Sequence, residues 1–262
     1  MSESKVHGEP GQRAVTRACA QAALLLMQHG SESALVENTA KRIGIAAGAD
    51  SVEIALLSNA IVVSTLVDGH CITTVRRMAD RGINMTMAVE VQRIMLDMEK
   101  KRMDIAEVER QLTALRPSHY NRWLVVGMVG ISCSAFAFLA GADFPALWIT
   151  FAASVCAMVV RQQLAFWHFN PLINFSVTAF LATSIAVQLL NFPPGTKTPH
   201  IALASCLLML VPGMPLINSL ADMVKGYVNT GIARLGFALL LCLGVCLGTA
   251  FALRVWNVRG WF

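Results

Sequence analysis

The stretch WLVVGMVGISCSAFAFLAG, residues 123–141, contains no charged side chain. A helix needs about 20 apolar residues to cross the hydrocarbon core of a bilayer. The low charge extends beyond this stretch, because residues 123–262 hold eight charged side chains and residues 1–122 hold the other 29. An ionised group at the bilayer centre is costly. The carboxyl-terminal part is therefore predicted to be a membrane bundle, joined near Pro117 to a domain of water-soluble composition.

Five apolar segments of suitable length lie in residues 118–262, which are predicted to form an all-α transmembrane domain. They are residues 123–141, 144–160, 172–192, 200–221 and 235–256. Four tryptophans near segment ends are typical of an aromatic belt: Trp123, Trp148, Trp167 and Trp256. No signal-peptide pattern opens the chain, so the first domain is predicted to be cytoplasmic. The slight excess of Lys and Arg on the inner flanks agrees, and five spans would leave the carboxyl end outside.

Residues 13–117 are predicted to form a small α+β domain, preceded by a disordered segment at 1–12. Helices are expected at 13–28 and from Ser31 or Ser33 to about 47, and again at 87–103 and 104–115. Between the pairs, strands at 51–57, 61–67 and 70–75 form an antiparallel meander. Asp68-Gly69 is a strong two-residue hairpin turn between the last two strands.

Several function classes find no support in the motifs. No nucleophile elbow, P-loop or GxGxxG after a strand is present, so no enzyme is predicted. The seven cysteines form no CxxC pair or Cys/His cluster, and no metal or cofactor is expected. No basic block is long enough to indicate nucleic acid. Arg76, Arg77 and Arg81 after the meander either hold an anion or merely protect the sheet edge.

The fourth apolar segment contains LVPGMPLINSLAD, residues 210–222. Pro212 and Pro215 flank Gly213 and remove backbone donors, which interrupts a helix. Inside a membrane such an interruption is tolerated only against protein or a watery cavity. Pro215 suits the first position of a new half-helix, whose amino end would attract a carboxylate. Pro212 and Gly213 are therefore predicted to bind a substrate carboxylate.

A polar stripe follows the interruption. Asn218, Asp222, Lys225 and Asn229 are spaced to share one helical face, which should meet a cavity or a partner instead of lipid. The alternative is that Asp222 and Lys225 end the span and pair with one another. Both interpretations remain open at this point, because intramembrane charge is often functional but these residues lie near a segment end.

A milder irregularity precedes the third segment. Asn170-Pro171 and Asn174 begin it, beside Arg161. Asn-Pro is a common way to start a helix, so the ordinary interpretation is a helix start. Arg161, Asn170 and Asn174 are kept as secondary candidates for a substrate path.

At these residues the chain resembles the threonine/serine exporter (ThrE) family. The resemblance rests on Leu210-Val211-Pro212-Gly213 followed by Asp222, Gly226, Gly231 and Arg234, and on Gly30, Val36-Glu37, Gly44, Thr74, Arg76 and Asn84 in the first domain. It covers about residues 13–256. Full-length members carry about ten spans, whereas five are predicted here. The chain is therefore similar to the shorter YjjP-type members, which act with a separate small membrane subunit and are associated with succinate export.

The resemblance implies a subunit of a bacterial inner-membrane secondary exporter of small carboxylates, either a dicarboxylate such as succinate or threonine and serine. Asn218 and Ser219 would contact the substrate, and Lys225 or Arg234 would neutralise a second carboxylate. Asp222 is the predicted proton-coupling residue. Glu37 and Arg76 are secondary candidates. The alternative is a membrane-anchored scaffold or sensor whose cytoplasmic domain binds a partner.

Overall fold

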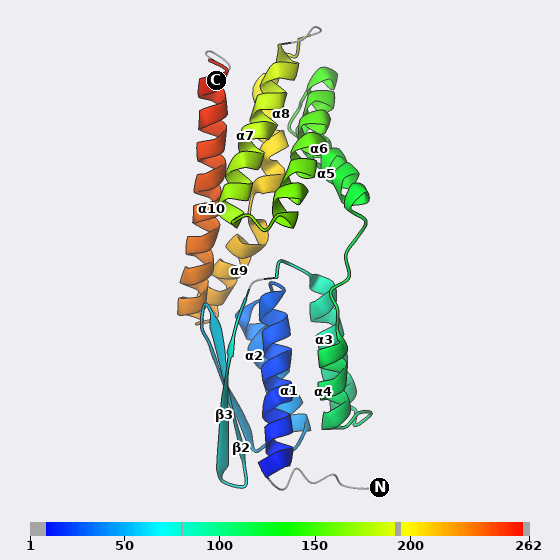
Figure 1. The fold of residues 1–262 in the computed structure, drawn as a ribbon, viewed down its shortest axis with the longest axis vertical. Coiled ribbons are helices and arrows are strands. Elements are labelled where there is room, and N and C mark those ends of the chain that lie inside the picture. The colour runs from blue at the N-terminus through cyan, green and yellow to red at the C-terminus, as the bar shows by residue number, and fades with distance from the viewer. Residues whose placement is uncertain (1–8, 80, 192–194, 259–262) are drawn as a thin grey trace. The chain divides into compact units, whose positions relative to one another are not determined.

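The computed structural model describes residues 9–79, 81–191 and 195–258, and Figure 1 traces their helices and strands. The chain divides into two compact units. The first, called here the amino-terminal unit, comprises Met1–His119 and Met214–Leu235. The second, called the bundle unit, comprises Tyr120–Gly213 and Gly236–Phe262. Residues 214–235, which were expected to belong to the membrane bundle, thus fold with the amino-terminal unit.

The amino-terminal unit has the predicted order of a helix pair, three strands and a second helix pair. Its elements are α1 (Glu9–Gln28), α2 (Ser33–Ala46), β1 (Ser51–Leu56), β2 (Ala60–Val67), β3 (His70–Arg77), α3 (Met85–Glu99) and α4 (Ile105–Ala114). Helix α1 begins at Glu9, although residues 9–12 were predicted to be disordered. Glu9 pairs with Arg13, and a carboxylate in the first turn suits the helix dipole. The rest of that predicted segment, residues 1–8, lies outside the described residues.

Helix α1 is the centre of this unit. It packs against α2, α3, α4 and the strands β2 and β3. Its buried side chains include many alanines, and small residues allow neighbouring helices to approach closely. Val15, Ala18, Ala22 and Leu26 are fully buried. The polar Gln12 is also buried, and its Nε2 donates to the carbonyls of Thr65 and His70, which fastens α1 to the sheet.

The sheet is the predicted antiparallel meander, in the order β1-β2-β3. Strand β2 alternates between buried and half-buried residues, with Ile61, Val63 and Val67 facing the core. Asp68 and Gly69 both have positive φ, at 48° and 79°, which confirms the predicted two-residue hairpin turn. Strand β3 is largely exposed.

The bundle unit holds the apolar helices. They are α5 (Arg122–Leu139), α6 (Phe144–Phe166), α7 (Pro171–Leu190), the short α8 (Pro199–Leu207) with the 3-10 turn η1 (Leu208–Leu210), and most of α10 (Val228–Val255). Among the described residues, four helices are long and apolar enough to span a membrane, and a fifth span is counted if α8–η1 and α9 (Gly213–Val224) form one bent pair. Four of the five predicted apolar segments are therefore confirmed as candidate spans, and the fourth segment in sequence order corresponds to the bent pair.

Small residues let the helices of the bundle unit pack closely. A Cβ on Gly248 would lie 2.2 Å from the backbone oxygen of Ser176, and one on Gly244 would lie 2.9 Å from the Leu172 side chain. The rings of Phe180 and Phe251 are in contact nearby, with centroids 5.5 Å apart and planes tilted by 35°. The GxxxG pattern of α10 therefore packs against α7 of the same chain.

The turn between α5 and α6 is tied to the segment before α8 through Asp143. Its carboxylate accepts hydrogen bonds from Thr196 Oγ1, from Lys197 N at 2.8 Å and from Thr198 Oγ1 at 2.9 Å. It also caps α6 through Ala146 N. Burial opposes ionisation, but these four donors outweigh it and lower the pKa of Asp143 to about 2. Asp143 therefore stays charged and holds the two connections together.

Two helix boundaries differ from the prediction in ways that matter for the site. Helix α6 continues to Phe166, so Arg161 lies inside it and not in a connecting segment. Helix α9 ends at Val224, where Gly226 has φ +91° and Tyr227 N donates to Asp222 O. This is a glycine helix end. Asn229 lies in α10, so it does not share a helical face with Asn218 and Asp222 as predicted.

Candidate functional site

The predicted interruption in the fourth apolar segment is present in the structure. Helix α8 and η1 end at Leu210, Val211 and Pro212 are not helical, and α9 begins at Gly213. Pro215, expected at the first helical position, is two residues inside α9. Gly213 N donates to Val211 O at 2.8 Å, and Val211 N donates to Leu208 O at 3.1 Å. The interruption frees backbone carbonyls that other groups must bind.

Arg161 of α6 binds one of these carbonyls. Its Nη1 donates to Met209 O at 2.9 Å, and its guanidinium lies 4.7 Å from the centre of the Phe175 ring. Asn174 Nδ2 donates to Arg161 O at 3.2 Å. Asn170 caps α7 by accepting from Leu172 N, which matches the ordinary interpretation of a helix start. The structure thus brings Arg161 and Asn174 together beside the interruption.

Asp222 of α9 is fully buried and binds the start of α2. Its Oδ1 accepts from Ser33 N at 2.8 Å and its Oδ2 accepts from Ser33 Oγ at 2.9 Å. Arg234 of α10 pairs with Oδ2 at 3.0 Å. Asp222 therefore caps α2 from outside, and the predicted alternative of an Asp222–Lys225 pair is wrong. The cap residue of α2 is Glu32, whose side chain makes no capping bond, so neither Ser31 nor Ser33 is the cap residue.

The other polar residues after the interruption also contact the loop before α2. Asn218 Nδ2 donates to Gly30 O at 2.7 Å, and Arg234 Nη2 donates to Ser31 O at 2.7 Å. Lys225 pairs with Glu32 at 2.6 Å. We call the set Ser33, Glu32, Asn218, Asp222, Lys225 and Arg234 the α2–α9 network. Ser219 is buried but bonds within its own helix, to Leu216 O.

Tyr227, between α9 and α10, binds Glu37 of α2. Its hydroxyl donates to Glu37 Oε2 at 2.5 Å, and Lys41 pairs with Glu37 Oε1 at 2.7 Å. Burial opposes ionisation of Glu37, but the bonds from Lys41 and Tyr227 outweigh it and lower the pKa of Glu37. Burial, and then the Glu37 carboxylate, raise the pKa of Tyr227 to about 12. Glu37 is therefore a charged acceptor and Tyr227 a neutral donor at physiological pH.

The predicted site residues fall into two groups. Pro212, Gly213, Arg161 and Asn174 belong to the bundle unit, whereas Asn218, Asp222, Lys225 and Arg234 belong to the amino-terminal unit. Arg76 is exposed on β3, paired in register with Ile61. Sequence reasoning missed Ser33 and Tyr227 as partners. No local signal pointed to Asp222, because Ser31 and Ser33 are both residue types that can cap a helix themselves.

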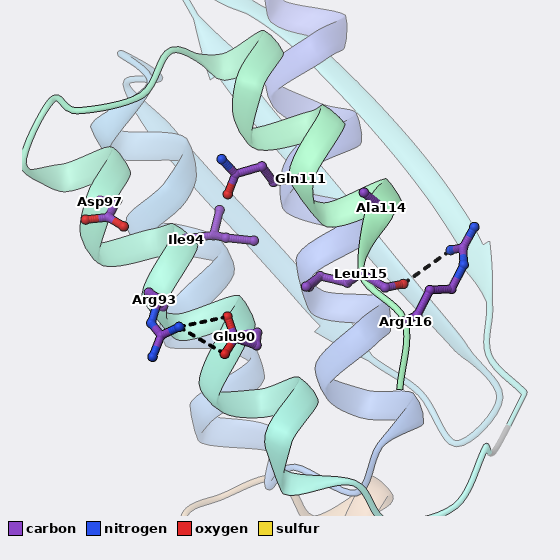
Figure 2. A pocket seen from close by; sticks show the side chains of 8 residues that line it. All are labelled: Glu90, Arg93, Ile94, Asp97, Gln111, Ala114, Leu115 and Arg116. Atoms are coloured by element: carbon purple, nitrogen blue, oxygen red, sulfur yellow. Dashed lines mark hydrogen bonds and ion pairs between the residues drawn. The ribbon is translucent and has the colours of Figure 1, made fainter. Parts of the chain in front are cut away.

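A separate surface pocket of about 310 Å³ lies between α3 and α4 in the amino-terminal unit, and Figure 2 shows its lining. Glu90 and Arg93 pair with one another at 3.1 Å, and Arg116 bonds to backbone carbonyls. The remaining lining residues are Ile94, Asp97, Gln111, Ala114 and Leu115. Within the described part of the chain, no group of three or more His, Cys, Asp and Glu side chains could hold a metal ion.

Comparison with known proteins identifies the family. A family model described as "Putative threonine/serine exporter" matches residues 17–256. The "Probable succinate transporter subunit YjjP" of Klebsiella aerogenes is 50% identical over 250 residues, which cover 95% of this chain and 97% of that protein. The protein of the same name from Escherichia coli strain K12 is also 50% identical, over 95% of this chain and 98% of that protein.

A more distant relative has a different printed name. The "Probable threonine/serine exporter" of Mycobacterium tuberculosis is 26% identical over 239 residues, which cover 88% of this chain but 44% of that protein. No solved structure matches the chain. The family match includes the helix interruption, Arg161 and the α2–α9 network, and the apolar helices agree with a membrane protein. The chain belongs to the threonine/serine exporter family.

Proposed function

We propose that this protein is a subunit of a bacterial inner-membrane secondary exporter of small carboxylates, and not an enzyme. The names of the two relatives with 50% identity favour a dicarboxylate such as succinate. The name of the more distant relative keeps threonine and serine as the second substrate class. The word "subunit" in the names of the two relatives with 50% identity supports a partner, proposed here to be a separate small membrane subunit.

The observation that carries the proposal is the interrupted helix at Val211-Pro212. Backbone groups that lack helical partners are tolerated at membrane depth only against protein or a watery cavity. In transporters such interruptions supply polar backbone to the substrate. The arginine that binds Met209 O puts a cation beside this backbone. An interrupted helix with an adjacent cation is suited to a carboxylate, and Pro212 and Gly213 remain the proposed docking point.

Asp222 is the proposed coupling residue. Protonation of its carboxylate would remove the charge that pairs with Arg234 and weaken the bonds from Ser33. Proton binding to Asp222 would thus weaken the attachment of α9 to α2. Helix α9 follows the interruption directly in the chain. Lys225 and Arg234 are already paired, so a second substrate carboxylate would have to displace Glu32 or Asp222.

The proposed topology places the amino-terminal unit in the cytoplasm and the carboxyl end outside. This follows from the apolar segments and the slight excess of Lys and Arg on the inner flanks. Fusion of a reporter to the carboxyl end tests it. A reporter that is active only in the periplasm should give signal there, and a signal from a cytoplasmic reporter would contradict the proposed topology.

The function is tested by copurification and transport. The tagged chain, extracted from membranes, should bring down an untagged small membrane protein, and vesicles containing both should export succinate or threonine. Vesicles with either one alone should not. Asp222→Asn should flatten the pH dependence of efflux. Unchanged efflux with unchanged pH dependence would remove Asp222 from the coupling step, and absence of efflux of any carboxylate would defeat the exporter proposal.

A membrane-anchored sensor is the second candidate, and the pocket between α3 and α4 favours it. Its lining contains the positively charged Arg93 and Arg116 and the negatively charged Glu90 and Asp97. A zwitterionic metabolite would match such a lining. If Arg116→Ala removed a transcriptional or binding response to a metabolite while efflux stayed at the wild-type rate, the pocket would be a sensor site and not part of transport.

A further inference from the structure

Arg161 is set deeper within an apolar helix than the other described charges of the bundle unit. It lies five residues before the end of α6, about 7 Å along the helix axis. By contrast, Arg122 begins α5, Arg254 is in the last turn of α10, and Asp143 and Lys197 lie between helices. A charge at such a position is costly and is typically retained for function.

The contacts of Arg161 account for only part of its bonding capacity. A guanidinium carries five N–H donors. Within residues 9–79, 81–191 and 195–258, Arg161 makes one hydrogen bond, from Nη1 to Met209 O, and forms no ion pair with a carboxylate. The ring of Phe175 covers one face. The edge formed by Nε and Nη2 is the edge that binds a carboxylate with two parallel hydrogen bonds.

The bundle unit offers no side-chain carboxylate that could pair with this arginine without giving up other bonds. Asp143 is the one acidic side chain in residues 120–213 and 236–262. Its oxygens already accept from Thr196, Thr198 and the backbone of Lys197. A half-buried arginine without an acidic partner in its own unit is poised to take a carboxylate from outside the chain.

We propose that Arg161 binds a carboxylate group of the transported substrate, with Phe175 and Met209 O holding its guanidinium in position. This inference rests on the proposed exporter function and names the cation at the substrate site. Asn174 supports the arginine from behind by bonding its backbone oxygen, and Thr178 in turn donates to Asn174 Oδ1. The competing role is purely structural, in which Arg161 only binds the carbonyl of Met209.

A binding experiment with charged and neutral ligand pairs separates the two roles. The full chain, purified with its membrane partner in a neutral detergent without phosphate, is titrated with succinate and succinamide, and with threonine and threoninamide. The wild-type protein should prefer the carboxylate of at least one pair. In Arg161→Gln, which keeps a donor for Met209 O, affinity for that carboxylate should fall roughly tenfold to hundredfold, to the level of the amide.

The matched control is Arg254→Gln, which removes an exposed arginine from the end of α10 and should leave the preference unchanged. Arg161→Gln with the wild-type preference for the carboxylate would overturn the inference and leave the exporter proposal intact. A wild-type protein that binds no carboxylate of either pair would defeat the exporter proposal, and the inference with it.

A second measurement does not depend on the variant folding. In the wild-type protein, an arginine-specific dicarbonyl reagent should modify Arg161, as detected by peptide mass spectrometry. Succinate or threonine should slow that modification, and the corresponding amide should not. Equal modification of Arg161 with and without a bound carboxylate substrate would overturn the assignment.

Discussion

Asp222 is one carboxylate that joins two stretches of chain 189 residues apart. Two hydrogen bonds to it come from Ser33, and Arg234, whose side chain is 17% exposed, forms an ion pair with it. A buried ion pair adds little to the stability of the folded protein when compared with an apolar pair of equal size. Removal of one partner, however, leaves the other charge buried and is costly.

Asp222→Asn should therefore lower the free energy of unfolding by about 2–4 kcal/mol. Thermal unfolding of the purified protein in detergent measures this change. The double variant Asp222→Asn/Arg234→Gln should lose less than the sum of the single losses, because both charges are gone. Asp97→Asn, which removes a surface pair with Arg102, is the control and should change stability by less than about 1 kcal/mol. Additive losses would show that the pair is not coupled.

Asp143, in the turn between α5 and α6, makes the stability of the folded protein depend on pH. Its pKa is about 2 in the folded protein and 3.8 for the unperturbed side chain. Because the folded value is the lower one, the contribution to stability is present above about pH 4 and is lost as the pH falls from there towards 2.

Asp143→Asn should destabilise the protein by about 1–2 kcal/mol at pH 7, because an amide accepts weaker hydrogen bonds than a carboxylate. The difference in melting temperature between wild type and variant should shrink as the pH falls from 5 to 3. Glu9→Gln is a control from the surface of α1 and should show little change at either pH. A difference that stays constant across this range would contradict the assignment.

At the scale of elements, α7 and α10 pack through glycine. Gly248 lies where any side chain would meet the backbone of Ser176, whereas a Cβ on Gly236 of the same helix would meet nothing within 4 Å. Substitution of Gly248 therefore tests both close packing and helix propensity, whereas substitution of Gly236 tests helix propensity alone. Both lie inside α10, so backbone conformation is not a difference between them.

Gly248→Ala should lower the free energy of unfolding by about 1–3 kcal/mol, because the backbones of α7 and α10 must move apart. Gly236→Ala should leave stability unchanged or raise it by about 0.5–1 kcal/mol through better helix propensity. Unfolding of both variants in the same detergent gives the comparison. Equal effects of the two substitutions would mean that α10 does not pack on α7 through Gly248.

For the whole molecule, the main feature is that the amino-terminal unit is assembled from two separate stretches. Residues 214–235 fold with residues 1–119, although 94 residues of the bundle unit lie between them in the chain. The two stretches are joined by the bonds from Ser33 to Asp222, by the Lys225–Glu32 ion pair and by the bond between Tyr227 and Glu37. A covalent link at residues 119–120 is therefore not what holds the unit together.

A chain cut between His119 and Tyr120, with both pieces expressed in one cell, should still form the amino-terminal unit. The tagged piece 1–119 should copurify with the piece 120–262 from detergent extracts. Introducing Asp222→Asn and Lys225→Gln into the longer piece should reduce its recovery, since the Lys225–Glu32 ion pair is lost and the hydrogen bonds from Ser33 to residue 222 are weakened. Recovery of the shorter piece alone, even with wild-type sequences, would contradict this division of the chain.

The sequence by itself determined the order of the helices and strands, the hairpin at Asp68-Gly69 and the helix interruption at Val211-Pro212. These features depend on hydrophobic patterning and on the backbone limits of glycine and proline, which act over a few residues. The end of α9 at Gly226 was available from the same local chemistry, although the predicted polar stripe ran past it.

Only the tertiary structure decided which groups those elements bring together. Ser33 and Glu32, which bind Asp222 and Lys225, lie about 190 residues earlier in the chain, and the contact of Arg161 with Met209 joins two helices. The local sequence shows that a charged residue in an apolar segment needs an ionic or hydrogen-bonding partner, but many side chains of the chain could be that partner. The packing of the folded chain selects one partner, because a buried charge is stable only where donors and acceptors converge.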